Sequence, residues 1–167
     1  MTTTQSWRDH LHLRKYTTYD IAFMQTLYAS IREPELAMTN FNTQERHEFI
    51  SQQFMAQYIH YTKHYCTDKF FIVEIAGQPV GRIFVDHWDN EIRIVDIALM
   101  PEHRGQGLGT HLFQQVLDDG KRLSLPVSVH VERNNPARFL YERLGFKLKT
   151  ERDDVYLLME WRPNTLL

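Results

Sequence analysis

The sequence predicts one domain, residues 1–167, of the α/β (α+β) class, with a central mixed, mostly antiparallel twisted sheet flanked by helices. About six or seven strands and about four helices are expected. A length of 167 residues suits one domain with its own core. No repeat, low-complexity stretch or linker divides the chain. Strand patterns come before alternating strand and helix patterns, as in a sheet packed by helices.

The first part of the chain predicts one strand and two helices. Residues 10–15 have the composition of a short strand. Residues 17–20 have the T-x-x-D spacing of a capping box, and apolar residues keep helical spacing over 21–31. Pro34 is expected to stop this helix or to start the next turn. A second box-like start opens a long helix over 42–65.

The middle of the chain predicts three consecutive strands. Strand-forming residues fill 70–75, 80–85 and 91–99. A turn at 76–79 and a loop at 87–90 separate them. Short connections of this kind join antiparallel neighbours, so an antiparallel meander is expected.

The last part of the chain alternates helices and strands. Its predicted elements are a polar, glycine-rich loop (101–109), a helix (110–119), a strand (126–131), a helix (136–144) and two strands (146–150 and 155–161). Gly120 is expected to cap the first of these helices, and Gly145 to close the second.

Composition excludes several classes of function. The net charge of −2 is not the basic footprint of a nucleic-acid binder. Cys66 is the single cysteine, which excludes an internal disulfide and suits a reducing compartment. His60 and His64 have the i, i+4 spacing of a metal pair but no third ligand nearby, so no metal is expected. Residues 1–10 lack an apolar signal core, and no apolar run approaches membrane length. We therefore expect a cytoplasmic protein with no nucleic-acid or membrane partner.

The stretch R-G-Q-G-L-G at 104–109, called the glycine loop below, follows a predicted strand and precedes a helix. Its three glycines permit tight bends and leave backbone N–H groups unobstructed. Free N–H groups at a helix N-terminus bind anions, and a pyrophosphate suits such a loop. The spacing is neither that of a dinucleotide fingerprint nor that of a P-loop. On glycine count alone, a tight loop without a ligand explains the pattern as well.

Two motifs together resemble the GNAT superfamily (GCN5-related N-acetyltransferases). The strand end I-A-L-M-P at 97–101, followed by R-x-x-G-x-G at 104–109, resembles motif A. The stretch N-N-P-A-R-F-L-Y-E-R-L-G-F at 134–146 resembles motif B. The resemblance covers most of 70–161, whereas 1–66 matches only as one strand and two helices. It implies the GNAT fold and an acyl-CoA-dependent N-acetyltransferase.

The resemblance also implies the residues that bind the co-substrate, acetyl-CoA. The strand backbone would pair with the pantetheine arm as an added strand, and the glycine loop would hold the pyrophosphate. The loop arginine would add charge or brace the loop, and one motif B asparagine would contribute. The implied residues are Ile97, Ala98, Leu99, Arg104, Gly105, Gln106, Gly107, Leu108, Gly109, Thr110 and Asn134, with Asn135 as the adjacent alternative.

Catalytic roles follow from the same resemblance. Tyr141 resembles the family tyrosine that gives a proton to the departing coenzyme A thiolate, although an aromatic side chain in the core is the alternative. Many relatives carry a glutamate base where this chain has Val95, which cannot take a proton. Asp96, His130 and Glu132 are the remaining candidates. A paired or solvated side chain is the alternative for each, and a water chain could replace a dedicated base.

The acceptor side is predicted from a hairpin. If Asp86 pairs with Glu91, then Arg82 and Arg93 lie on the face of Val95, which the resemblance places in the cleft. Two arginines there would suit a carboxylate or phosphate on the acceptor. A small amine bearing an anionic group, such as an amino acid or short peptide, is therefore expected. Alternatively, the arginines pair with the two acidic residues across the strands.

An aromatic stripe adds to this prediction. Phe54, Tyr58, Tyr61 and Tyr65 lie on one side of the second predicted helix, where the family builds its acceptor wall. Tyr58 and Tyr61 are thus candidates for acceptor binding, and a core stripe is the alternative. Two other functions stay open: a CoA-binding regulatory module without turnover, and acetylation of a protein N-terminus or lysine. A homodimer is also open, since such folds often dimerise.

Overall fold

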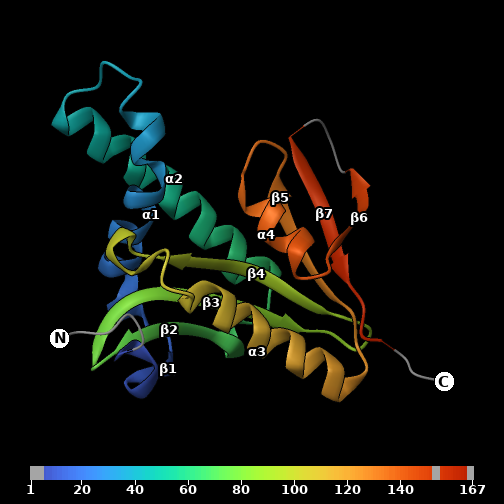
Figure 1. The fold of residues 1–167 in the computed structure, drawn as a ribbon. Helices are drawn as coiled ribbons and strands as arrows, with labels where there is room; N and C mark the ends of the chain where they lie inside the picture. The colour runs from blue at the N-terminus through green and yellow to red at the C-terminus, as the bar shows by residue number, and fades with distance from the viewer. Residues whose placement is uncertain (1–5, 152–154, 165–167) are drawn as a thin grey trace. The chain divides into compact units, whose positions relative to one another are not determined.

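The computed structural model describes residues 6–151 and 155–164 and divides into two compact units (Figure 1). The first unit comprises Met1–Ile83 and Ile97–Gly109, and the second comprises Phe84–Asp96 and Thr110–Leu167. Strands follow the order β1-β2-β3-β4-β5-β7-β6 in a seven-stranded sheet, and the described residues form four α-helices. These elements confirm the predicted fold class.

The first unit holds the first strands and helices. Its elements, the last two of which continue into the second unit, are β1 (Leu11–Lys15), α1 (Ile21–Leu36), α2 (Thr43–His64), β2 (Phe70–Ile75), β3 (Gln78–His87) and β4 (Ile92–Leu99). β1 pairs antiparallel with β2, from Leu11 opposite Ile75 to Lys15 opposite Phe71. Helices α1 and α2 pack together through rings 6.1 Å apart, those of Tyr28 and Phe54.

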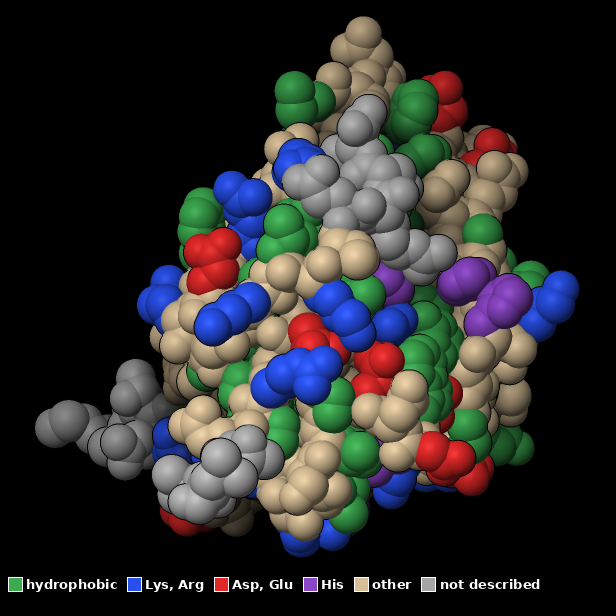
Figure 2. All heavy atoms as spheres, turned by 90° about the vertical axis from the view of Figure 1, so that its right-hand side faces the viewer, with side chains coloured by type: hydrophobic (Ala, Val, Ile, Leu, Met, Phe, Trp, Pro, Cys, Tyr) green, Lys and Arg blue, Asp and Glu red, His purple; other side chains and the backbone are tan. Residues whose placement is uncertain are grey.

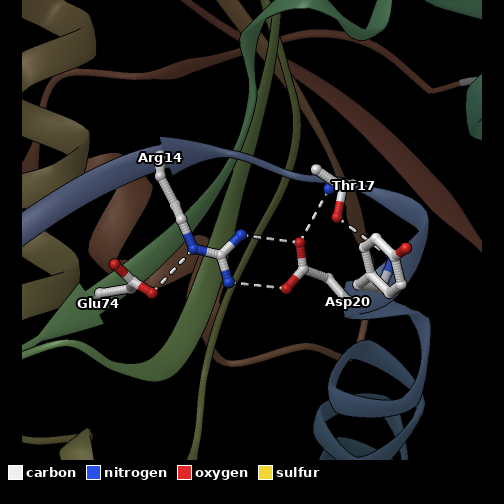
Figure 3. Close-up of polar contacts among 5 residues, drawn as sticks. Arg14, Thr17, Asp20 and Glu74 are labelled. Carbon is white, nitrogen blue, oxygen red and sulfur yellow. Dashed lines mark hydrogen bonds and ion pairs between the residues drawn. The ribbon is translucent and has the colours of Figure 1, made fainter.

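Both predicted capping boxes are present. The Thr17 side chain caps a short 3-10 turn that leads into α1, and the Asp20 carboxylate accepts the Thr17 N–H at 2.8 Å. At the start of α2, Asn42 and Glu45 exchange the same pair of bonds at 2.8 and 3.0 Å. Asp20 also accepts two hydrogen bonds from Arg14 of β1, which in turn reaches Glu74 of β2 (Figure 3). The start of α1 is thereby tied to the sheet of this unit.

Two predicted boundaries in this unit are wrong. α1 contains Pro34 and continues to Leu36, which is buried. The turn after β2 is also shorter than predicted. Ala76 and Gly77 both have positive φ, of 51° and 79°, which is typical of a two-residue hairpin turn, so β3 begins at Gln78.

The second unit contains the last strands and helices. Its elements are α3 (Leu108–Leu123, beginning in the first unit), β5 (Val127–Glu132), α4 (Ala137–Arg143), β6 (Lys147–Glu151) and β7 (Tyr156–Trp161). β4 pairs parallel with β5 from Ile92 opposite Val127 to Ile94 opposite Val129. β7 lies between β5 and β6 and is antiparallel to both. The sheet is therefore mixed, as predicted.

Gly120 does not cap α3, contrary to the prediction. The helix continues to Leu123, and Ser124 adopts the left-handed conformation beyond its end, with φ of 56°. A Cβ at Gly120 would lie 2.8 Å from the Trp161 ring and 2.9 Å from the Leu125 carbonyl oxygen. This glycine is therefore required by close packing rather than by the helix end. Gly145 does follow α4 as predicted, with φ of 102°.

Each unit has an apolar core. Fully buried side chains of the first unit include Met24, Leu27, Phe54, Phe70 and Ile72, and those of the second include Ile92, Leu112 and Val127. Among the described residues, none of the helices combines the length and the apolar character needed to cross a membrane.

Candidate functional site

The glycine loop of the first unit has a left-handed backbone at two positions. Gly105 has φ of 73° and Gly107 has φ of 83°, and α3 begins directly afterwards at Leu108. A Cβ at either glycine would meet no atom within 4 Å. The glycines are therefore needed for the backbone conformation, and the space beside them is open, as a cradle for an anion would be.

The backbone N–H groups at the centre of this loop differ from those before it. His103 and Arg104 donate their N–H groups to Met100 and Pro101. Within residues 6–151 and 155–164, none of the backbone bonds recorded outside helices and strands is donated by 105, 106 or 107. Such N–H groups before a helix N-terminus can bind phosphate oxygens, and the helix dipole adds to the attraction.

Side chains hold the loop from behind. The Arg104 Nε donates to the Leu99 carbonyl oxygen at 2.9 Å, and one Nη lies 3.4 Å from the Ser30 Oγ. These contacts support the bracing role predicted for Arg104. The Gln106 carbonyl oxygen accepts the Trp7 indole N–H at 3.1 Å. No local sequence pattern indicates Ser30 or Trp7, because both contacts join distant segments.

The end of β4, predicted to pair with pantetheine, is held against β3. Ala98 and Leu99 are buried and Ile97 is half-buried. A Cβ at Gly81 of β3 would overlap the Ala98 carbonyl oxygen and lie 2.7 Å from the Leu99 side chain. Sequence analysis missed Gly81, whose lack of a side chain allows this close approach.

Tyr141 lies on α4 in the second unit, within an aromatic group. Its ring centroid is 5.0 Å from that of Phe113 and 5.9 Å from that of Phe146. Burial, and then the negative charge of Asp96, raise the pKa of Tyr141 to about 12. The phenol therefore stays protonated at physiological pH, as a proton donor must. The half-buried position of Tyr141 among these rings fits both predictions, the core aromatic and the general acid.

A second group of side chains, the Arg93 cluster, joins β4 to β5 in the same unit. It comprises Arg93, Glu91, Ser128, His130 and Trp88. The Arg93 Nε donates to Ser128 Oγ at 2.8 Å, and Nη atoms lie 3.4 Å from His130 Nδ1 and 3.7 Å from a Glu91 carboxylate oxygen. The Ser128 hydroxyl donates to Glu91, and the guanidinium lies 4.8 Å from the Trp88 ring centroid. Arg93 is only 8 % exposed, so these contacts use it as a buried structural group.

The same cluster bears on His130 as a base. A guanidinium can only donate hydrogen bonds, so His130 must accept at Nδ1 and carry its proton on Nε2. A base needs a free lone pair, and the one on Nδ1 is engaged. Of the three predicted candidates, His130 thus contacts Arg93, and the charge of Asp96 acts on Tyr141.

The predicted hairpin register is wrong by two residues. The Trp88 N–H donates to the Glu91 carbonyl oxygen at 2.8 Å, so Trp88, not Asp86, lies opposite Glu91. The strand continues further than predicted because a two-residue connection, Asp89 and Asn90, is enough to reverse the chain. At the other end of the two strands the Met100 N–H donates to the Val80 carbonyl oxygen at 2.8 Å, a register that differs by one residue from that at Trp88, so the predicted faces do not hold along the whole pair.

Arg82 and the aromatic stripe lie in the first unit. Arg82 is 2 % exposed, donates to Gln57 Oε1 at 2.6 Å and lies 5.8 Å from the Tyr61 ring centroid. The Tyr58 hydroxyl is 3.2 Å from that of Tyr16, and its ring stacks on buried Phe54. These contacts favour packing roles for Arg82 and Tyr58. Tyr61 is half-buried, so the stripe is part core and part surface.

The remaining predicted residues lie around the end of β5. Asn135 Oδ1 accepts the Ala137 N–H at 2.9 Å and thus caps the start of α4. Asn134 and Asn135 are both exposed, so both stay candidates for the motif B asparagine. Glu132 is half-buried opposite Tyr156 of β7, and Thr110 is exposed in the first turns of α3. Most residues predicted to bind the acyl donor thus belong to the first unit, whereas the residues predicted to act in catalysis belong to the second.

Comparisons with known proteins agree with these observations. A Bacillus subtilis protein with the provisional name ribosomal protein bS18-alanine N-acetyltransferase is 34 % identical over 83 residues, covering 47 % of this chain and 53 % of the relative. An N-alpha-acetyltransferase of Sulfurisphaera tokodaii is 30 % identical over 93 residues, covering 47 % and 56 %. The chain thus spans about half the length of these curated relatives.

Solved structures share the fold. The PaiA N-acetyltransferase of Thermoplasma acidophilum, in complex with coenzyme A, superposes with a TM-score of 0.66 at 17 % identity, covering 91 % of this chain and 98 % of that one. The ribosomal-protein-S18-alanine N-acetyltransferase of Escherichia coli gives 0.61 at 17 % identity, covering 93 % and 96 %. The family model of the Acetyltransferase (GNAT) family matches residues 27–146. This chain therefore belongs to the GNAT acetyltransferase family.

Proposed function

We propose that this protein is an N-acetyltransferase that uses acetyl-CoA and acts on the α-amino group of a peptide or protein N-terminus. The glycine loop is the observation that supports acetyl-CoA as the acyl donor. It has two left-handed glycines, open space beside them and backbone donors at the start of α3. A loop of this kind fits a pyrophosphate.

Residues of the first unit would bind the donor. The N–H groups of 105–107 and the first turn of α3 would hold its phosphates, while Arg104 braces the loop through Leu99. The backbone at Ile97–Leu99 would take the pantetheine arm as an added strand. When bound, acetyl-CoA supplies a thioester whose acyl group an amine can accept.

Tyr141 would assist the leaving group. As the amine nitrogen attacks the thioester carbonyl, the carbon–sulfur bond breaks and negative charge develops on sulfur. A phenol whose pKa is about 12 is a weaker acid than a thiol, whose pKa is near 8.5. Tyr141 therefore donates a hydrogen bond to the negative charge that develops on sulfur. The proton that the amine loses is the one that neutralises the thiolate. The raised pKa of Tyr141 ensures that the hydrogen is present.

Asp96 would be the base in this proposal. Its charge acts on Tyr141, whereas the lone pair of His130 Nδ1 is held by Arg93. A carboxylate takes the amine proton directly or through a water molecule. Asp96 thereby replaces the glutamate that many relatives carry at the position of Val95.

The acceptor class follows from two observations. Arg82 and Arg93, on which the expectation of an anionic small acceptor depends, are both buried and hydrogen-bonded. Curated relatives, in contrast, are named for acetylation of protein α-amino groups. An N-terminal amine therefore replaces a small anionic amine as the favoured acceptor. A nucleic-acid acceptor is not expected, because the net charge is −2. On the face shown in Figure 2, basic and acidic side chains both occur.

Thiol release from acetyl-CoA tests the proposal. The acceptors are peptides with a free N-terminus, the same peptides with a blocked N-terminus and an internal lysine, and a panel of amino acids, polyamines and aminoglycosides. We expect turnover only with free N-termini, and strongly reduced turnover in the Tyr141→Phe variant. Turnover with small amines alone would overturn the acceptor class. Binding of acetyl-CoA without any turnover would indicate a regulatory module, and failure to bind it would refute the role of the glycine loop.

A further inference from the structure

A buried tryptophan from the N-terminal segment contacts the glycine loop. Trp7 lies in a short 3-10 turn, Ser6–Asp9, and is 3 % exposed. Its Nε1–H donates to the carbonyl oxygen of Gln106, 99 residues later, at 3.1 Å. The Arg8 guanidinium lies 4.4 Å from the Trp7 ring centroid. Because all these residues belong to the first unit, the contact does not depend on the second.

This hydrogen bond controls the direction of one amide group. The carbonyl oxygen of Gln106 and the N–H of Gly107 belong to the same peptide unit, which is planar and trans. The two groups of a trans peptide point in opposite directions. A carbonyl held toward Trp7 therefore turns the Gly107 N–H away from Trp7.

Without such an anchor, this peptide could rotate easily. Gly105 and Gly107 flank Gln106, and a glycine accepts positive and negative φ about equally well. Arg104 holds only the beginning of the loop, through the Leu99 carbonyl oxygen. The Gln106 side chain bonds the Glu102 carbonyl oxygen and so fixes the side chain, but not the peptide that follows.

We propose that Trp7 is a positioning residue for the acyl donor, which sets the Gln106–Gly107 peptide so that the Gly107 N–H faces the pyrophosphate. This inference rests on the proposed function, because it assumes that the glycine loop binds acetyl-CoA. The inference concerns the pyrophosphate alone, because the peptide that Trp7 contacts lies in the glycine loop.

The Trp7→Phe variant tests the inference, because it keeps an aromatic ring and removes the N–H donor. We expect the Kd of acetyl-CoA, measured by calorimetry, to rise about fivefold, as the loss of one hydrogen bond predicts. The kcat at saturating acetyl-CoA should not change. With S-acetylpantetheine, which has the thioester but no pyrophosphate, kcat/KM should also stay as in the wild type.

Two controls separate positioning from general damage. Trp161→Phe removes another buried indole, in the second unit, and should lower the melting temperature without changing the Kd of acetyl-CoA. If Trp7→Phe does not fold, benzothienylalanine at position 7 replaces only the N–H by sulfur, and the same increase in Kd is expected.

The possible outcomes are distinct. An unchanged Kd in a wild type that binds acetyl-CoA would overturn the role of Trp7 while leaving the proposed function intact. An equal fall of kcat/KM with acetyl-CoA and S-acetylpantetheine would also overturn it, because the effect would then be a general loss of structure. A wild type that fails to bind acetyl-CoA would instead refute the proposed function.

Discussion

The glycine loop of the first unit and the Arg93 cluster of the second are built from different parts of the chain. In the glycine loop, the groups that would meet a ligand are backbone N–H groups, and the anchors end on the carbonyl oxygens of Leu99 and Gln106. In the Arg93 cluster, side chains bond to side chains, from Arg93 to Ser128, His130 and Glu91.

This difference predicts how each region responds to substitution. A site made of backbone N–H groups keeps these groups when most side chains are replaced. It loses its binding geometry when a substitution removes a glycine conformation. A cluster of side chains loses its contacts when any one member is replaced. A polar or charged group that is left without its partner then destabilises the fold. The predictions below test this contrast, beginning with the largest effect.

Tyr141→Phe in the second unit should have the largest effect. The variant keeps the ring among Phe113 and Phe146 and removes only the hydroxyl group. Loss of a positioned proton donor lowers kcat by roughly 10²- to 10⁴-fold, and we expect about 10³-fold here. Steady-state kinetics measure the fall in kcat, while the Kd of acetyl-CoA should stay unchanged.

The exposed Tyr19 offers a control for this substitution. Tyr19→Phe removes a hydroxyl group from a side chain that is 96 % exposed, and it should leave kcat unchanged. If Tyr141→Phe has the kcat of the wild type, then Tyr141 is an aromatic packing residue and nothing more.

Arg93→Ala should mainly change stability. Removing this guanidinium leaves the half-buried Glu91 without its positive partner, which lowers the free energy of unfolding by about 3 kcal/mol. Urea denaturation measures the loss. The exposed Arg122, which pairs with Asp119, provides the matched control, and Arg122→Ala should change stability by less than about 0.5 kcal/mol. If the Arg93→Ala variant instead has wild-type stability and a higher KM for the acceptor, Arg93 binds the substrate.

Gly107→Ala tests the backbone region directly. A non-glycine residue in the left-handed conformation costs about 1–2 kcal/mol, so the exposed loop should relax to another conformation. Binding of acetyl-CoA must then restore the strained conformation, and its Kd should rise about tenfold. Calorimetry measures this increase.

Gly77 provides a close control for this prediction. It has φ of 79° in the turn between β2 and β3, and a Cβ there also meets no atom within 4 Å. Gly77→Ala introduces the same strain and should lower stability without changing the Kd. Equal Kd values for wild type and Gly107→Ala would mean that the conformation of the loop is not used for binding.

The same contrast explains what the sequence could predict. Glycines that are needed for a backbone conformation lie close together in the sequence, so a local pattern predicts the glycine loop. Local patterns also predict both capping boxes. Gly81 and Gly120 serve close packing against distant segments, and Gly120 was therefore given the wrong role. Arg93 meets Ser128, 35 residues later, through strand pairing that no local pattern encodes. The register error at Trp88 has the same origin, since one turn decides it.

Asp20 tests whether a side-chain network in the first unit also follows this contrast, and its effect should be the smallest. The Arg14 guanidinium, by two hydrogen bonds, holds the pKa of Asp20 below its ordinary value (Figure 3). A carboxylate of lowered pKa stabilises the fold above its unfolded pKa, near 3.9, and this stabilisation is lost as pH falls through the folded pKa. Asp20→Asn should therefore lower the free energy of unfolding by about 1 kcal/mol at pH 7, because Arg14 is partly exposed.

Denaturation at several pH values measures this difference between wild type and Asp20→Asn. The difference in the free energy of unfolding should have its full size at pH 7. It should decrease as pH falls below about 4, because the wild-type carboxylate then becomes neutral as well. Asp68, whose pair with Lys15 is 3.6 Å long and exposed, is the control, and Asp68→Asn should show no such dependence. A difference that is constant from pH 7 to the acid limit would show that Asp20 acts through its capping hydrogen bond to Thr17, a backbone contact, rather than through the charge of Arg14.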